Sequence, residues 1–194
     1  MGSEMCIRDS LLDGLNAAEL IAAAGPGDNR IPISEIPFDI DEPGSYFVTQ
    51  DLINTTDDTN GITIDANNVT IDLGGFRLTS DMGPNTGVGI FNRTAISMIN
   101  QTNVHIRNGI IDDWDAGGIS ASSCDHCIFE DLIISRTSVG LRVGDYSVVS
   151  NVTASNNRVA GVSIGEGNIV AHSTANNNDA VSYTHLTLPT IYSV

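Results

Sequence analysis

The sequence contains no lysine, and its eight basic residues are all arginines. They are opposed by 24 aspartates and glutamates, which gives a formal net charge of −16 at pH 7. A surface with this excess repels phosphate backbones and anionic head groups, so we expect no nucleic-acid partner. The same excess is typical of a highly soluble surface, of a protein from salty water, or of a protein with several divalent-cation sites.

Long apolar runs are also missing. No stretch approaches the roughly 20 apolar residues of a membrane-spanning helix, so we expect no membrane span. Residues 11–24 (LLDGLNAAELIAAA) are interrupted by Asp13, Asn16 and Glu19. This segment predicts a short amphipathic helix or the remnant of a leader.

Cysteine is scarce as well, with three residues in the chain. Cys124 and Cys127 form a single C-x-x-C pattern in SSCDHC. A zinc site would need two further ligands, and a redox motif favours a helix N-terminus. Metal binding, a local disulfide and two buried thiols therefore all stay open.

What the sequence does contain is an internal repeat. Five segments align over twelve columns without gaps, beginning at Asn68, Asn103, His126, Tyr146 and Gly167. A glycine followed by a short β-branched run marks each unit, at Gly61, Gly89, Gly118, Gly140 and Gly161. A repeat of about 21 residues without helical periodicity predicts a solenoid whose units bury their apolar faces on each other.

The two ends differ from this repeat. Met5 to Asp9 (MCIRD) can be encoded by ATG TGT ATA AGA GAC, and the reverse complement of that sequence encodes VSYTH, which is Val181 to His185. Residues 1–10 and 181–194 therefore resemble one sequencing adapter translated on opposite strands. We expect residues 11–180 to be an internal fragment of a longer protein, and we exclude the ends from fold reasoning.

Alternation within the repeat predicts which side chains face inward. Val69, Ile71, Val104 and Ile106 share the core face, whereas the fifth column, Asp72, Arg107 and Glu130, should stack outward as a structural charge ladder. The sixth column reads Leu73, Asn108, Asp131, Asn151 and His172. Because Asn and Asp tolerate a left-handed backbone, we expect a stacked turn here. The ninth column, Phe76, Ile111, Ile134, Ala154 and Ala175, is expected to face inward.

Three strands per coil and an Asn-rich turn after the second resemble the right-handed parallel β-helix of the pectate lyase-like superfamily. The resemblance covers about residues 31–180, and it implies an all-β solenoid of about five coils. The segments IPISEIPFDIDEPGSYFVTQDL and GITIDANNVTIDLGGFRL are similar to the entry of secreted bacterial β-helix proteins. We therefore expect a short helix and linker at 11–30, cap strands at 31–60, coils at 61–180, and a secreted or cell-surface location.

In pectate lyase-like enzymes the substrate groove lies outside the strand that here follows the marker glycine. The resemblance implies that this strand presents Thr63, Phe91, Ser120, Arg142 and Ser163. The loop IIDDWDAGG places Asp112, Asp113 and Asp115 beside Trp114. Three close carboxylates suit calcium, and exposed Trp114 and Phe91 would bind sugar rings. The alternative is that the aspartates are solvated turn residues and that Trp114 caps an edge of the core.

Two function classes follow. The first is a module that binds or processes an extracellular polysaccharide, acidic in the case of a calcium-dependent lyase with Arg142 as its catalytic residue. The second is a non-catalytic adhesin or surface-structural repeat protein. Polygalacturonase-like hydrolases share NTD, DD, GHG and R-x-K segments; the chain lacks GHG and R-x-K, and Asp112 with Asp113 is a partial match. Converging aspartates in a groove beside Trp114 would favour the first class, and diverging aspartates would favour the second.

Overall fold

The computed structural model describes residues 29–56, 58–81 and 93–183, and the described part is built entirely from strands and turns. The expectations for residues 1–28, 82–92 and 184–194 concern positions outside the described residues; they include the expected helix and most of the adapter-like ends. The strands are β1 (Ile31–Ile33), β2 (Phe38–Ile40), β3 (Gly44–Val48), β4 (Leu52–Asn54), β5 (Ile62–Ile64), β6 (Val69–Asp72), β7 (Arg77–Ser80), β8 (Thr94–Met98), β9 (Val104–Asp112), β10 (Gly117–Ala121), β11 (Ile128–Ser135), β12 (Val139–Val143), β13 (Val148–Ser155), β14 (Ala160–Ile164), β15 (Ile169–Ala171), β16 (Thr174–Asn176) and β17 (Ala180–Tyr183).

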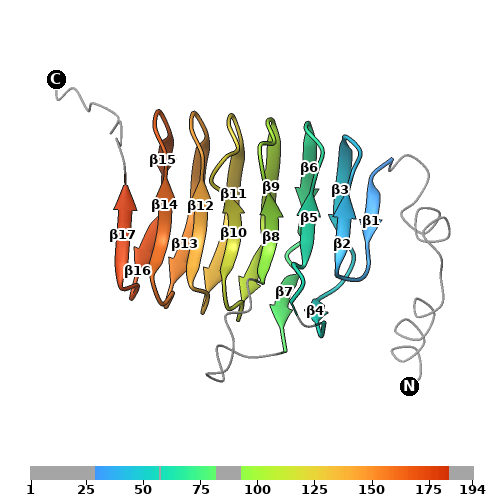
Figure 1. Cartoon of the computed structure of the whole chain (residues 1–194), viewed down its shortest axis with the longest axis horizontal. Helices are drawn as coiled ribbons and strands as arrows, with labels where there is room; N and C mark the ends of the chain where they lie inside the picture. Colours follow the sequence, from blue (N-terminus) through green and yellow to red (C-terminus); the bar gives the residue numbers. More distant parts are fainter. Residues whose placement is uncertain (1–28, 57, 82–92, 184–194) are drawn as a thin grey trace, which may run out of the picture.

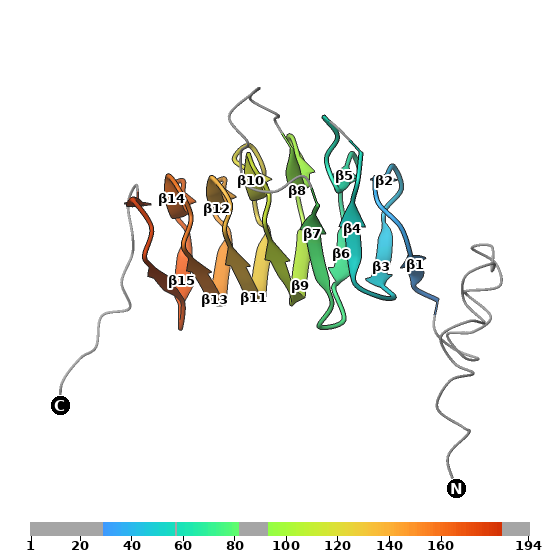
Figure 2. The same cartoon turned by 90° about the horizontal axis from the view of Figure 1, so that it is seen from below.

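These strands form a parallel β-solenoid of about six turns, which confirms the expected fold class (Figure 1). The first sheet runs β1-β3-β6-β9-β11-β13-β15, with β4, β7 and β16 beside that path. The second sheet runs β17-β14-β12-β10-β8-β5-β2 and forms the opposite layer in Figure 2. Within the described residues no helix is long and apolar enough to span a membrane.

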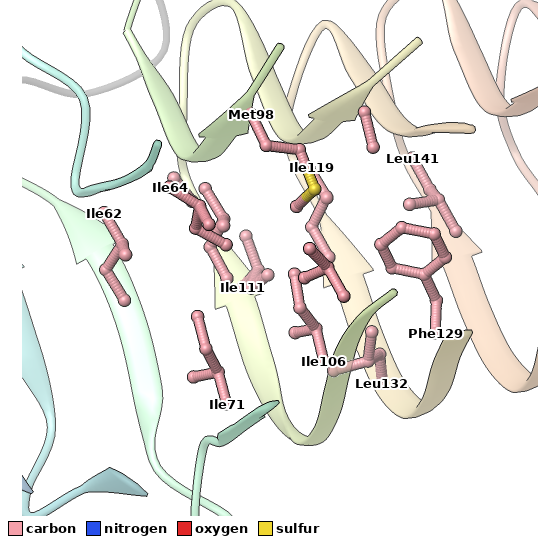
Figure 3. Packing of buried hydrophobic residues seen from close by; sticks show 14 of the residues in the cluster. Ile62, Ile64, Ile71, Met98, Ile106, Ile111, Ile119, Phe129, Leu132 and Leu141 are labelled. Atoms are coloured by element: carbon pink, nitrogen blue, oxygen red, sulfur yellow. The ribbon is translucent and has the colours of Figure 1, made fainter. Parts of the chain in front are cut away.

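The core lies between the two sheets and follows the predicted alternation. Val69, Ile71, Val104 and Ile106 are almost completely buried, as are the inward residues of the second sheet. Figure 3 shows Ile106, Phe129, Leu132 and Leu141 packed in this interior. Each coil buries its apolar side chains against those of the next coil, so the solenoid has one continuous core.

The turns use left-handed backbone at equivalent positions of successive coils. In the sixth column Asn108, Asp131, Asn151 and His172 have φ between 50° and 60°, which confirms the expected turn for these four coils. Leu73, the first residue of that column, is instead buried in the core without left-handed backbone. The Asn151 amide donates to Asp131 Oδ1 at 2.5 Å, one coil away. The left-handed residue is skipped in the pairing between these coils, but pairing resumes at the next residue, so β9, β11 and β13 each continue beyond the turn as one long strand.

The marker glycines stand where neighbouring coils approach most closely. A Cβ added at Gly118 would lie 2.4 Å from the Gly140 carbonyl oxygen, and one added at Gly140 would lie 2.5 Å from that of Gly161. Real Cβ atoms do not approach oxygen so closely. The glycine repeat therefore reflects packing between coils.

Two details of the first coils differ from the alignment. The inward position expected for Phe76 is occupied by Leu78, which pairs with Ile111, because Gly74 and Gly75 both adopt positive φ and add two residues to that turn. The marker position expected for Gly89 is occupied by Ala95, since β8 pairs Ile96 with Ile62 and with Ile119. Ile96 and Ser97 thus take the inward and outward places expected for Ile90 and Phe91.

Candidate functional site: an arginine-clamped corner and an open polar row

The three aspartates of the IIDDWDAGG loop lie at the corner where β9 ends, and arginines bind them. The Asp112 side chain is only 2% exposed, although it points outward from the sheet. Arg77 Nη1 lies 2.7 Å from Asp112 Oδ2, Arg136 Nη2 contacts the same oxygen, and Ser135 Oγ donates to Oδ1 at 2.7 Å. Asp112 is therefore buried beneath the side chains that neutralise it.

Arg136 also binds Asp113. Its Nε donates to Oδ1 at 2.8 Å and its Nη2 to Oδ2 at 2.7 Å, which is the two-pronged geometry that guanidinium and carboxylate groups favour. This hydrogen bonding lowers the pKa of the Asp113 carboxyl and raises the pKa of Arg136. Arg136 and Asp113 occupy equivalent positions on successive coils, and both have a left-handed backbone. Their side chains therefore meet at the corner.

Asp115 faces a different pair of arginines. Arg93 Nη2 lies 3.4 Å from Asp115 Oδ2, and both side chains are nearly buried. The Arg158 guanidinium donates to the Asp115 backbone carbonyl. Asp115 thus diverges from Asp112 and Asp113, which share Arg136.

This arrangement differs from the calcium site that the sequence suggested. In the described part of the chain, no group of three or more His, Cys, Asp or Glu side chains could hold a metal ion. The oxygens that calcium would need accept hydrogen bonds from Arg77, Arg136 and Ser135 instead.

Trp114 is fully buried, so the expected exposed sugar platform is wrong. Its Nε1 donates to the Leu78 carbonyl at 3.1 Å, and a Cβ added at Gly61 would lie 2.8 Å from the indole Cη2. Trp114 follows the left-handed Asp113 just as Asn157 follows the left-handed Asn156. The backbone thus turns this residue inward, and Trp114 is part of the core itself rather than a cap on its edge.

An open polar row crosses the outer face of the second sheet. Ser97, Ser120, Arg142 and Ser163 pair in register on neighbouring strands, and Thr63 and Asp39 extend the row toward β2. Thr63, Ser120, Arg142 and Ser163 face outward as the sequence predicted, with Arg142 the most exposed of these. Phe91 lies outside the described residues, and Ser97 stands in the place expected for it. Arg142 forms no ion pair with any described residue, and Trp114 and the aspartates do not join this row.

The charge ladder of the first sheet is present with altered partners. Asp72, Arg107 and Glu130 pair in register as predicted. Arg107 Nη2 lies 3.2 Å from Asp72 Oδ2, whereas Glu130 Oε1 lies 2.8 Å from His105 Nε2. Although partial burial opposes the shift, hydrogen bonds from the Gly74 amide and Asn108 lower the pKa of Asp72.

Cys124 and Cys127 are free thiols and are buried. Burial raises the pKa of Cys124 to about 11 and also raises that of Cys127. A thiol that stays protonated is a poor nucleophile and a poor metal ligand. Of the alternatives left open by the sequence, two buried thiols match the structure.

The clamping arginines were missed by the sequence reasoning. Their signal was present, because Arg136 occupies the same column as Asp113 one coil later, and Ser135 the same column as Asp112. Arg77 was hidden by the two-residue shift after Gly74. Comparison of the chain with protein-family models, with curated proteins and with solved structures gave no match.

Proposed function

We propose that this chain is a non-catalytic module of a secreted or cell-surface protein that binds an extended polysaccharide along the open polar row of the second sheet. The parallel β-solenoid fits the resemblance of residues 31–180 to the pectate lyase-like β-helices. That resemblance is the basis for proposing a secreted or cell-surface location and a polysaccharide ligand. The observation that carries the proposal is the in-register row of outward hydroxyl side chains, interrupted by the guanidinium of Arg142.

The geometry of the row suits a polymer. Neighbouring strands lie about 4.8 Å apart, so the row offers a hydroxyl or a guanidinium at regular intervals along the solenoid axis. Such groups hydrogen-bond to sugar hydroxyls directly or through water. A chain lying across the strands would meet Thr63, Ser97, Ser120, Arg142 and Ser163 in turn.

Asp115 diverges from Asp112 and Asp113 and Trp114 is buried, which favours the non-catalytic class; the proposal therefore keeps polysaccharide binding and omits cleavage. Elimination from a uronate needs a cation or equivalent at the carboxylate and a base within hydrogen-bond reach of the proton. Asp112, Asp113 and Asp115 are engaged by arginines. Beside Arg142 the row carries Ser120 and Ser163, whose hydroxyls are weak bases.

A steric test separates this row from the rest of the surface. Ser120→Tyr places a ring in the middle of the row, and Thr153→Tyr makes an equivalent outward change on the first sheet. Affinity electrophoresis through gels that contain neutral and acidic polysaccharides would measure binding. We expect at least one polysaccharide to retard the wild type and Thr153→Tyr but not Ser120→Tyr. Absence of retardation by every polysaccharide, or equal retardation of both variants, would overturn the proposal.

A further inference from the structure

Resting on the proposed function, we infer that the ligand is a polysaccharide whose carboxylates are isolated among neutral sugars, rather than a polymer with a carboxylate on every residue. The inference comes from the charges along the polar row and at its border. The row itself supplies one cation, and the border that follows its strands places several anions close to that cation. The arginines at the opposite border, Arg93, Arg136 and Arg158, are engaged at the aspartate corner.

Arg142 is the single cation of the row. Its in-register neighbours are Ser120 and Ser163, which offer hydroxyl groups only. Asp39 ends the row on β2, four strands from β12 and therefore about 19 Å away. One carboxylate can be paired at Arg142, and a second carboxylate over Asp39 would be repelled.

The border of the row is acidic. Asp125, Asp145 and Glu166 lie in the turns that follow β10, β12 and β14. Asp145 Oδ1 accepts the Glu166 amide at 2.7 Å, and Asp125 Oδ1 accepts the Asp145 amide at 3.2 Å. These hydrogen bonds between coils hold the carboxylates in line along the solenoid.

The acidic border lies close enough to Arg142 to repel an anionic ligand bound there. Asp145 is three residues from Arg142, at most about 10 Å along the chain. The Debye length at physiological salt is about 8 Å, so the border is partly screened and acts mainly on an anion bound beside Ser120, Arg142 or Ser163. A sugar in an extended chain is about as long as the strand spacing. A homopolyuronate would therefore place unpaired carboxylates over several serines, beside the acidic border.

A galacturonan with graded methyl esterification tests this, because esterification removes charge and leaves the backbone unchanged. The samples would have none, half, most or all of their carboxyl groups esterified. Wild type would be compared with Arg142→Gln and with Arg107→Gln, which removes the same charge from the other sheet. Affinity electrophoresis at physiological salt would measure how tightly each of the three proteins binds each of the four polymer samples.

We expect wild type and Arg107→Gln to bind the mostly esterified polymer best, about tenfold more tightly than the fully esterified one, the usual effect of one charge-assisted hydrogen bond. Arg142→Gln should bind those two polymers equally. Tightest binding to the unesterified polymer, or no dependence on esterification, would overturn this inference and leave the proposed function standing. Absence of binding to all four samples and to neutral polysaccharides would instead remove the proposed function.

Discussion

Replacing Asp112 by asparagine tests whether the aspartate corner is a structural clamp. The substitution keeps the shape of the side chain and removes the charge that Arg77 and Arg136 both contact. Removing one partner of a fully buried ion pair costs about 3–5 kcal/mol. Here the two guanidinium groups are 44% and 50% exposed, so water continues to solvate them. We therefore expect a loss of about 2 kcal/mol, between the values for buried and exposed pairs.

Asp113→Asn is the matched control. Asp113 shares Arg136, but its side chain is 25% exposed, so we expect a loss of under about 1 kcal/mol. The fluorescence of Trp114, the only tryptophan of the chain and fully buried beside this corner, would report urea unfolding. With a typical m-value of about 2 kcal/mol/M, Asp112→Asn should lower the urea midpoint by about 1 M.

Two results would refute this reasoning. The first is a midpoint for Asp112→Asn equal to or above that of Asp113→Asn, since burial of Asp112 beneath two arginines would then carry no cost. The second is a midpoint of the wild type that rises with calcium but not with magnesium, and that no longer rises in Asp113→Asn. That result would show that the aspartates bind calcium in preference to the arginines.

Three further predictions concern packing, pH and thiol chemistry. Gly118→Ala should destabilise the fold by about 1–3 kcal/mol because its Cβ would meet a backbone oxygen at 2.4 Å, whereas Gly117→Ala, with a nearest contact of 3.4 Å, should change the urea midpoint little. Because Arg136 lowers the pKa of Asp113, the stability from this pair is complete above the unfolded-state pKa of about 4 and is lost as pH falls toward the folded-state value. Acid titration of Asp113→Asn should therefore show a shallower loss of stability than the wild type below about pH 4. Cys124 and Cys127, buried and with raised pKa values, should resist iodoacetamide at pH 8 in the native protein and react fully in urea, as mass spectrometry would show. Rapid labelling without urea would contradict their placement.

The sequence predicted the solenoid well because the same constraints recur in every coil. Alternating Val and Ile residues set the strand faces, and Asn108, Asp131 and Asn151 recur where the backbone is left-handed. Within the solenoid, the expected alignment was wrong where the first coils depart from the average. Gly74 and Gly75 lengthen one turn, so Leu78 replaces Phe76 in the core.

The candidate site could be predicted far less well, because it depends on contacts between coils. Asp112 and Asp113 are acidic residues in a turn by sequence, and only the register places Arg136 over them. The direction of Trp114 is set by the left-handed backbone of Asp113 before it. Side-chain direction at a corner changes with one residue, so alternation along the strand does not predict it.

The arginines at the aspartate corner and the arginine of the open row differ in whether they pair with a carboxylate. Arg30 and Arg107 both pair with Asp72, Arg77 and Arg136 with Asp112, and Arg93 with Asp115, while Arg158 binds the Asp115 carbonyl. Guanidinium suits these contacts because its planar donors can serve two oxygens at once, which the point charge of lysine does less well. Arg142 is the exception among the described arginines, since it stands exposed between two serines. In a chain of net charge −16, this exposed cation, which pairs with no described carboxylate, is the feature on which the proposed binding of an acidic sugar rests.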